Sequence, residues 1–316
     1  MDIQGRNALI TGGAIRVGRA ITETLAGAGA NVFIHYNRSA GPADELAESL
    51  RGMGIQAVTG SSDLSDPTGA GALVEQATAA LGPVSILVNS ASGFPADTLG
   101  DVTPGGFRAA QDLTLGSPLF LTQAFADQLP DGLQGSVVNI TDVKTMRPYR
   151  EHVSYMLAKG GVDTLTRAAA LSLAPRIRVN AVALGVILPP PGEGEDYVNA
   201  LAADLPLGRV GGAAVVADTV LFLTRNDFVT GEIIRLKPPV VIRELAEQLG
   251  QKPFSVIASL MEMGIFATVN QAIDELAAQK VCAKFGFRFE LEKRDRTAKP
   301  VVQQKREVEL DFEDKE

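Results

Sequence analysis

The chain has 316 residues, of which 46% are hydrophobic, so it can bury a core large enough for one big domain or two smaller ones. It carries 29 basic and 37 acidic residues, and the net charge of −8 argues against a surface built throughout for nucleic acid. A single cysteine excludes an internal disulfide and a cysteine-based metal cluster, and two histidines leave little for a histidine-rich metal site. No apolar run approaches the ~18 residues that a membrane span needs, so we expect a cytoplasmic protein without a membrane partner.

From residue 1 to about 236, short apolar segments alternate with longer helical patterns. The predicted strands are residues 7–11, 31–35, 55–58, 84–89, 136–140, 177–182 and 231–236. The predicted helices are residues 16–28, 44–53, 67–81, 104–129 and 153–173. Nearly all-apolar strands that alternate with helices are typical of a parallel sheet buried on both faces. We therefore predict an α/β fold for residues 1–236, with a doubly wound parallel Rossmann sheet.

The pattern changes after Leu236. Lys237-Pro238-Pro239 is a break that neither a helix nor a central strand tolerates. Beyond it we predict helices at 243–249, 253–263 and 270–285, each followed by a glycine, and a short strand at 287–291. Residues 237–292 are thus expected to form a small, mostly helical C-terminal domain. Residues 293–316 are rich in charge and are expected to be a disordered tail.

A glycine-rich segment, Thr11 to Gly18, lies between the first predicted strand and the first predicted helix. Glycines at this turn let the backbone approach a pyrophosphate, while the helix N-terminus supplies N–H donors and a positive dipole. Gly12 and Gly18 are therefore candidate cofactor-binding residues. An ordinary tight turn is the other interpretation of these glycines.

The end of the second strand indicates which dinucleotide fits. An acidic residue there would bind a ribose 2′-hydroxyl and repel a 2′-phosphate, but this chain has His35-Tyr36-Asn37-Arg38-Ser39. Arg38 and Ser39 can donate hydrogen bonds to a phosphate, and a charge-assisted bond is worth about 1.5–3 kcal/mol. The segment predicts NADP(H) rather than NAD(H), unless Arg38 is a solvated surface residue.

Tyr155 and Lys159 stand four residues apart, on one face of a predicted helix. A lysine ammonium beside a phenol favours the phenolate, so we expect a lowered tyrosine pKa and a group able to pass a proton to a carbonyl or imine. A surface pair is the alternative, because this spacing is common. Its position favours the catalytic interpretation, since the pair follows a predicted strand that ends near Asp142.

Together these residues resemble the short-chain dehydrogenase/reductase family over residues 1–236. The motifs that carry the likeness are Thr11-Gly12…Gly18, Asp63-Leu64, Asn89-Ser90-Ala91-Ser92, Tyr155…Lys159 and Arg178-Val179-Asn180-Ala181-Val182. Four further features resemble the pteridine-reductase branch, which includes bacterial dihydromonapterin reductases. They are Arg16 at the second glycine position, the 35–39 segment, Asp142 at the catalytic serine position, and Ser92-Gly93-Phe94-Pro95, which resembles a pterin-stacking loop.

The resemblance implies an NADPH site at the carboxyl ends of the strands, a small-molecule substrate and a homo-oligomer. The implied cofactor contacts are Gly12, Arg16, Gly18, His35, Arg38, Ser39, Asp63, Leu64, Asn89, Ala91 and Lys159. Lys159 would hold the nicotinamide ribose and tune Tyr155, which with Asp142 would supply the proton. Phe94 would stack on a pterin, and Arg16 and Ser92 would contact substrate or cofactor phosphate. From the residues alone, Asp142 can also be a loop acid that caps backbone N–H groups, and Phe94 can be a core aromatic.

The chain departs from the family at several positions. Thr114 stands at the helix asparagine, Ser90 at the second asparagine of the strand motif, and Leu184 at a proline. The usual Asp-Gly-Gly after the last strand is absent from the segment that runs into Lys237-Pro238-Pro239. These departures keep two hypotheses open. One is an NADPH-dependent reductase, and the other is a nucleotide-binding scaffold or sensor with little turnover.

The C-terminal segment has a second resemblance. Residues 237–292 resemble the small N-terminal domain of bacterial translation initiation factor two, through segments such as Leu260-Met261-Glu262-Met263-Gly264 and Asn270-Gln271-Ala272-Ile273-Asp274. The chain is thus expected to be a fusion protein whose second domain docks to a ribosome or RNA partner. Its candidate basic patch is Lys280, Lys284, Arg288, Lys293, Arg294 and Arg296, for which a solvated helix face and tail is the alternative.

Overall fold

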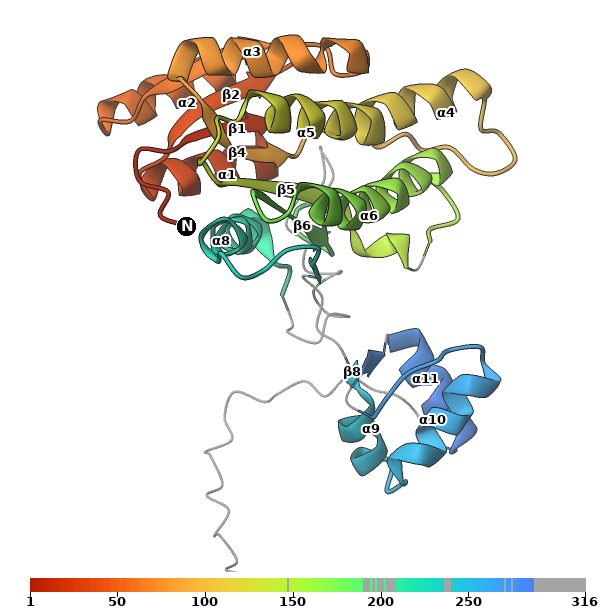
Figure 1. Ribbon diagram of the computed structural model, residues 1–316. Coiled ribbons are helices and arrows are strands. Elements are labelled where there is room, and N and C mark those ends of the chain that lie inside the picture. Colours follow the sequence, from red (N-terminus) through yellow and green to blue (C-terminus); the bar gives the residue numbers. More distant parts are fainter. Residues whose placement is uncertain are drawn as a thin grey trace, which may run out of the picture.

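The computed structural model describes residues 1–146, 148–189, 194, 197, 202, 209–235, 240–269, 271–273 and 275–286. Its centre is a seven-stranded parallel sheet in the order β3-β2-β1-β4-β5-β6-β7 (Figure 1). The strands are β1 Asn7–Thr11, β2 Asn31–Tyr36, β3 Ala57–Ser61, β4 Val84–Asn89, β5 Gly135–Asp142, β6 Ile177–Leu184 and β7 Ile233–Arg235. This order confirms the predicted doubly wound Rossmann sheet.

Helices cover both faces of the sheet, each over its own hydrophobic core. One core joins the sheet to α1 Arg16–Gly27, α2 Ala40–Gly52 and α8 Gly212–Arg225. The other joins it to α3 Ala70–Leu81, α5 Ser117–Gln128 and α6 Val153–Leu173. The central strand β4 is buried along its whole length because it faces both cores. Within the described ranges, no helix has the length and apolarity to cross a bilayer.

Several predicted elements differ from the structure in detail. The helix predicted at 104–129 is interrupted, because α4 Pro104–Gln111 is followed by the π-helical turn η2 Asp112–Gly116 before α5 begins. Pro118 has no N–H to donate to the carbonyl of Thr114, which explains a widened turn at this point. Helix α8 was not predicted, although Val216, Val220 and Leu223 lie along its buried face.

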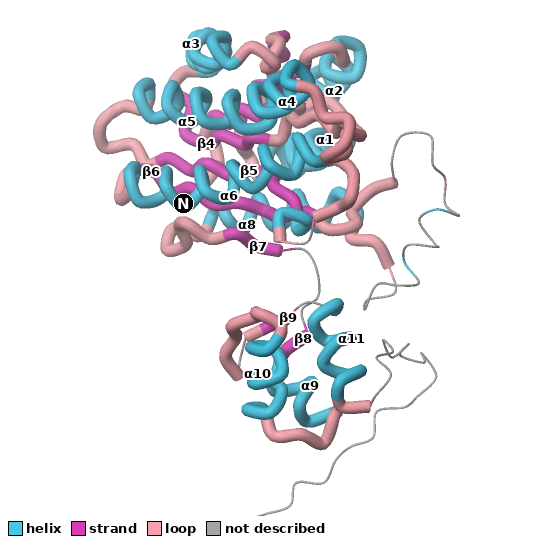
Figure 2. The backbone as a smooth tube through the Cα atoms, turned by 90° about the vertical axis from the view of Figure 1, so that its right-hand side faces the viewer, coloured by secondary structure: helices cyan, strands magenta, loops and turns pink. Residues whose placement is uncertain are grey.

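The C-terminal residues build a small core of their own. Strand β8 Val240–Val241 pairs antiparallel with β9 Ala272–Ile273, beside helices α9 Ile242–Gln248, α10 Pro253–Glu262 and α11 Glu275–Lys284 (Figure 2). Leu245, Val256, Leu260 and Val281 are buried between them. The prediction of a helix from residue 270 was wrong at its start, because residues 272–273 pair as a strand. The strand predicted at 287–291 and the tail at 293–316 lie outside the described residues, and the domain boundary at 236/237 stays a prediction.

All strands of the large sheet run parallel, so their carboxyl ends meet at one edge. The chain order reverses at β1, because β2 lies on one side of it and β4 on the other. At such a switch point the loops that follow two neighbouring strands turn to opposite faces and leave a crevice between them. The glycine segment after β1 and the Asn89–Ser92 segment after β4 flank this crevice.

Candidate active site at the carboxyl edge of the sheet

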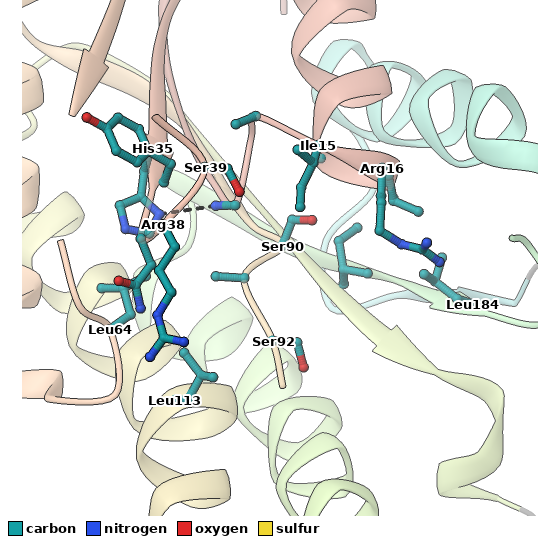
Figure 3. A pocket seen from close by; sticks show the side chains of 18 of the residues that line it. Ile15, Arg16, His35, Arg38, Ser39, Leu64, Ser90, Ser92, Leu113 and Leu184 are labelled. Atoms are coloured by element: carbon teal, nitrogen blue, oxygen red, sulfur yellow. Dashed lines mark hydrogen bonds between the residues drawn. The ribbon is translucent and has the colours of Figure 1, made fainter. Parts of the chain in front are cut away.

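A cavity of about 470 Å³ lies at the switch point (Figure 3). The predicted residues on its wall are Gly12, Arg16, Gly18, His35, Arg38, Ser39, Leu64, Ala91, Ser92, Tyr155 and Lys159. The wall is completed by apolar side chains such as Ile15, Leu113, Ile140 and Leu184. Figure 3 shows Arg38 and Arg16 at opposite sides of the cavity. The structure thus brings together predicted residues from five separate segments of the chain, at 12–18, 35–39, 64, 91–92 and 155–159.

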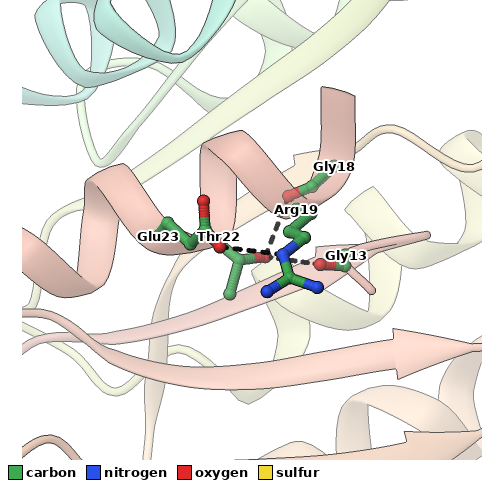
Figure 4. A network of polar contacts seen from close by, with 5 residues as sticks. All are labelled: Gly13, Gly18, Arg19, Thr22 and Glu23. Atoms are coloured by element: carbon green, nitrogen blue, oxygen red, sulfur yellow. Dashed lines mark hydrogen bonds and ion pairs between the residues drawn. The ribbon is translucent and has the colours of Figure 1, made fainter. Parts of the chain in front are cut away.

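The glycine turn after β1 is tight and tied to the helix that follows it. Gly12 has a φ of 63°, in the left-handed region that favours glycine. A Cβ at Gly18 would overlap the carbonyl oxygen of Gly12 and would lie 2.8 Å from its carbonyl carbon. The Thr22 hydroxyl lies 3.0 Å from the carbonyl oxygen of Gly13 and 2.9 Å from that of Gly18, which holds the turn against α1 (Figure 4). Both predicted glycines are therefore needed for this close backbone approach.

His35 supports the glycine turn from β2. The backbone N–H of Gly12 donates to Nδ1 of His35 at 3.1 Å. Nε2 of His35 therefore carries the proton and donates to the Ser62 carbonyl at 3.0 Å. Burial lowers the pKa of His35, an effect partly opposed by the Ser62 bond, and this keeps the ring neutral. Both ring nitrogens thus have hydrogen-bond partners within the protein, and the imidazole stabilises the position of the glycine turn on the cavity wall.

Arg38 and Ser39, just after β2, lie on the cavity wall, whereas Asp63 does not. Asp63 accepts hydrogen bonds from Asn37 at 3.3 Å and from the backbone N–H of Ser65 at 3.0 Å. The hydrogen bonds from Ser65 lower the pKa of this carboxyl, and the positive charge of Arg38 adds to the effect. Asp63 therefore supports the segment that carries Arg38, while Leu64 lies on the wall itself.

Asn89 also lies away from the cavity. Its side chain is 3% exposed and donates to Oδ1 of Asn139 at 2.8 Å, and Asn139 donates in turn to Thr166 on α6 at 2.9 Å. The residue that positions the wall here is Thr11, which the glycine motif included but to which the sequence assigned no role of its own. Its hydroxyl oxygen accepts from the backbone N–H groups of Ser90 and Ala91 at 3.0 and 3.1 Å. Thr11 thereby fixes the loop that carries Ala91.

Tyr155 and Lys159 lie on the cavity wall, and Tyr155 contacts Asp142, which is not itself part of the wall. The Tyr155 hydroxyl donates to Oδ2 of Asp142 at 3.0 Å. The Lys159 ammonium donates to the Ile140 carbonyl at 2.7 Å and lies 5.6 Å from the centroid of the Tyr155 ring. The backbone N–H of Lys144 donates to Oδ1 of Asp142 at 2.8 Å. Asp142 is therefore both a capping acid and a partner of the tyrosine.

The expectation of a lowered tyrosine pKa is wrong for this structure. Burial raises the pKa of the Tyr155 phenol above its usual range, and the Asp142 carboxylate raises it further by its charge and its hydrogen bond. Burial lowers the pKa of Lys159 to about 8, while Asp142 and Asp163 act in the opposite direction. Tyr155 therefore keeps its proton at neutral pH, which suits a proton donor.

Phe94 is a surface aromatic rather than a core one, with 55% of its area exposed. Its ring stacks on His152 at a centroid distance of 3.6 Å and meets the Tyr155 ring edge-to-face at 4.8 Å. His152 has a φ of 63° and bonds the Pro95 carbonyl through Nδ1 at 2.8 Å. The loop with Phe94 is thus joined to the first turn of α6.

Asp97 makes a second connection between this loop and α6. Its carboxylate accepts from the backbone N–H of Ser154 at 3.0 Å and from the Ser154 hydroxyl. Sequence reasoning missed Asp97 and His152, because Asp97 lies 57 residues before Ser154 and no local pattern connects a distant loop to the start of α6. Ser92 and Thr114 also meet, with 3.4 Å between their hydroxyl oxygens, so the family's asparagine position contacts the predicted substrate loop.

Arg16 extends from the glycine turn toward the segment after β6. It has a φ of 53°, and its guanidinium donates to the Pro189 carbonyl at 2.8 Å. Leu184, at the end of β6, lines the same side of the cavity (Figure 3). Arg16 therefore closes the cavity on this side.

Comparison with known proteins identifies the family. A family model described as enoyl-(acyl carrier protein) reductase matches residues 13–236. Pteridine reductase 1 of Leishmania tarentolae is 35% identical over 276 residues, which cover 72% of this chain and 94% of that protein. The chain belongs to the short-chain dehydrogenase/reductase family. The L-xylulose reductase of Bos taurus is 32% identical over 244 residues, and the match covers 74% of this chain and 96% of that protein.

Solved structures of this short-chain dehydrogenase/reductase family give the same fold. The alternative dihydrofolate reductase 1 FolM of Brucella canis, in complex with NADP, is 36% identical with a TM-score of 0.70. The match covers 75% of this chain and 94% of the FolM chain. A blue fluorescent protein from a metagenomic library, in complex with NADPH, is 31% identical with a TM-score of 0.70 over 75% of this chain and 98% of its own. Residues 239–288 match the N-terminal region of translation initiation factor IF-2.

Proposed function

We propose that this oxidoreductase is an NADPH-dependent reductase of a pterin-like or related carbonyl or imine substrate. The observation that carries the proposal is the hydrogen bond from Tyr155 to Asp142, beside the buried Lys159, at the end of a cavity with a glycine turn and Arg38 on its wall. A cavity of this kind offers donors for a dinucleotide phosphate and a proton donor for a substrate.

The residues present fit an NADP cofactor. The turn between Gly12 and Gly18 leaves no room for a Cβ, so a pyrophosphate could approach its backbone closely. Arg38 and Ser39 lie on the wall at the end of β2, where a 2′-phosphate would meet them. Lys159 is the buried cation that would bind the nicotinamide ribose. When bound, NADPH supplies the hydride of the reduction.

Tyr155 would supply the proton. Its raised pKa keeps the phenol protonated, so the O–H bond breaks as the substrate atom accepts the proton. The phenolate that remains lies beside the ammonium of Lys159, which stabilises it. Asp142 orients the phenol through Oδ2 and, as a carboxylate, can also accept from N–H donors of a pterin ring.

Phe94 supports the choice of a flat substrate. Its half-exposed ring lies edge-to-face with Tyr155 and is backed by His152, so an aromatic surface stands next to the proton donor. Planar rings bind such surfaces through stacking worth about 0.5–1.5 kcal/mol beyond the area that they bury. The relatives named pteridine reductase and alternative dihydrofolate reductase favour a pterin among flat substrates.

Replacing Arg38 by alanine is expected to weaken NADPH binding about ten- to a hundredfold, because one charge-assisted bond to the 2′-phosphate is lost. NADH lacks that phosphate, so its affinity should change by less than about threefold. Fluorescence titration with both dinucleotides measures the two effects. Arg108→Ala, which removes an exposed arginine of α4 outside the cavity wall, is the control and should leave both affinities unchanged.

We also propose a docking role for residues 239–288, supported by their match to the N-terminal region of translation initiation factor IF-2. Of the six predicted basic residues, Lys280 and Lys284 lie on α11 in the described part of the chain, and Lys284 pairs with Glu262 on α10. Lys280 is exposed. The full chain is expected to sediment with purified ribosomes, and the Lys280→Glu variant is expected to sediment with them less. Equal sedimentation of the wild type and the Lys280→Glu variant would contradict a role of the basic patch in ribosome binding.

A further inference from the structure

We infer that Asp163 is a positioning residue of this active site, which holds the chain on both sides of Asp142 and places a negative charge near Lys159. Asp163 is not part of the cavity wall and belongs to none of the motifs that predicted the site. The inference rests on the proposed function, since it assigns a role in the proton donation and cofactor binding proposed above.

Two threonine hydroxyls lie at hydrogen-bond distance from the Asp163 carboxylate. Thr141 donates to its Oδ1 at 2.6 Å, and the hydroxyl of Thr145 lies 2.8 Å from its Oδ2. Thr141 directly precedes Asp142 at the end of β5, and Thr145 is the last residue of the short helix η3 Val143–Thr145. The carboxylate therefore fixes the chain before and after Asp142 to helix α6.

This clamp matters because the Asp142 carboxylate depends on the same turn. Oδ1 of Asp142 caps η3 through the backbone N–H of Lys144, and its carbonyl oxygen lies 3.0 Å from the Thr145 hydroxyl. The remaining oxygen, Oδ2, is the one that accepts from Tyr155. If η3 shifts, the direction of Oδ2 shifts with it. Asp163 thus connects the position of Asp142 to α6, which also carries Tyr155.

Asp163 also faces Lys159, which stands one helical turn earlier on α6. Burial lowers the pKa of Lys159 to about 8, and the charges of Asp142 and Asp163 both raise it. The other titratable or charged groups on the cavity wall are Tyr155 on α6, Arg16 on the glycine turn, and three residues at or just after the end of β2, namely His35, Tyr36 and Arg38. The two carboxylates are the negative charges that favour the ammonium form of Lys159.

The sign of the effect follows from these charges. Removal of the Asp163 charge lowers the pKa of Lys159, so the ammonium is lost at a lower pH. Since Lys159 would bind the cofactor ribose as a cation, NADPH affinity should then decline at a lower pH than in the wild type. If Asp163 only stabilised the fold, its replacement would weaken NADPH binding at every pH and would not change the pH at which the affinity declines.

The test compares Asp163→Asn with Asp163→Glu in NADPH fluorescence titrations from about pH 6 to pH 9.5, a range that spans the lysine pKa discussed above. Asparagine keeps the size of the side chain and an acceptor for Thr141 but removes the charge. We expect Asp163→Asn to bind as the wild type does near pH 6, and its loss of affinity to occur about half to one pH unit lower. Asp163→Glu keeps the charge and should follow the wild-type curve.

Two further variants complete the experiment. Thr145→Val removes one bond of the clamp without changing any charge, so it should lower the rate of substrate reduction about three- to tenfold while its NADPH curve stays that of the wild type. Asp218→Asn makes the same chemical change on the exposed surface of α8 and should alter neither quantity.

The outcomes separate the two proposals. If the wild type binds NADPH and the Asp163→Asn curve coincides with it, the positioning role is wrong and the proposed function stands. If the wild type binds no NADPH at any pH, the proposed function fails and this inference fails with it. If Asp163→Asn does not fold, the inference stands or falls on Thr145→Val, whose turnover must decrease at an unchanged NADPH curve.

Discussion

Replacement of Tyr155 by phenylalanine is expected to lower NADPH-dependent reduction about a hundred- to ten-thousandfold, the usual contribution of a positioned proton donor. Affinity for NADPH should stay within about twofold of the wild type, because only the hydroxyl is removed and the ring remains in place. The hydroxyl bonds Asp142, while Lys159 keeps its own bond to Ile140. Stopped-flow absorbance of NADPH measures turnover, and fluorescence titration measures binding.

Tyr149→Phe is the matched control for this substitution. Tyr149 is 39% exposed and lies edge-to-face with Phe94 at 6.4 Å, so it belongs to the same aromatic cluster. The Tyr155 hydroxyl donates to Asp142, whereas no hydrogen bond joins the Tyr149 hydroxyl to Asp142 within the described residues. Loss of the Tyr149 hydroxyl should therefore change turnover by less than about threefold. Wild-type turnover in Tyr155→Phe would show that another group donates the proton.

The pH dependence of turnover follows from the same geometry. Tyr155 has its pKa raised by burial and by Asp142, so the donor remains protonated through the neutral range. Lys159 has its pKa lowered to about 8, so the loss of its ammonium comes first as the pH rises. The alkaline decline of activity should therefore report Lys159 rather than Tyr155.

Replacement of Gly18 by alanine is expected to weaken NADPH binding about ten- to a hundredfold, since forcing an added methyl group against packed backbone costs about 1–3 kcal/mol. The added Cβ would overlap the carbonyl oxygen of Gly12 and crowd Gly13 at 3.2 Å. The turn must then open, which moves the backbone that would bind the pyrophosphate. Fluorescence titration measures the loss, and thermal unfolding shows whether the sheet remains intact.

Gly27→Ala is the control on the same helix. A Cβ at Gly27 meets nothing within 4 Å, and Gly27 is the last residue of α1. Alanine is favoured over glycine in a helix by about 0.5–1 kcal/mol, so this variant should bind NADPH normally and unfold at an equal or higher temperature. Normal NADPH binding by Gly18→Ala would refute the role of the glycine turn as a cofactor cradle.

Much of the fold could be predicted because its signals are local. Strands such as Val84–Asn89 are mostly apolar on both faces and are buried along their whole length, and the apolar pattern identifies a sheet covered on both faces. Helix α8 was missed although its apolar residues have helical spacing, and the π-turn at Asp112–Gly116 depends on the local effect of Pro118 within a continuous helical pattern. Strand β9 could not be inferred from residues 272–273 alone, because its pairing with β8 joins segments about 30 residues apart.

The candidate site shows the same division. The places of Gly12, Tyr155 and Lys159 on the cavity wall could be predicted because each belongs to a motif with fixed spacing, and that of Arg38 because it directly follows a predicted strand. The inward direction of Asn89 depends on its bond to Asn139 on the neighbouring strand, which no local pattern reports. The raised pKa of Tyr155 likewise depends on burial and on a carboxylate from another element.

The structure favours a reductase over a nucleotide-binding scaffold. A scaffold needs the glycine turn and Arg38, but it has no use for a buried phenol bonded to a carboxylate and placed beside a buried ammonium. The substitution at Thr114 also leaves a polar contact in place, since its hydroxyl meets that of Ser92. We therefore expect turnover even where the chain departs from its family.

The measurement that tests this account most directly is NADPH oxidation by the full chain with dihydropterin, dihydrobiopterin and dihydrofolate offered in turn. We expect saturable oxidation with at least one of them, abolished in Tyr155→Phe and weakened in Asp142→Ser. Saturable NADPH binding with no oxidation in the presence of any of the three would contradict the pterin assignment and favour a scaffold that acts through residues 237–292.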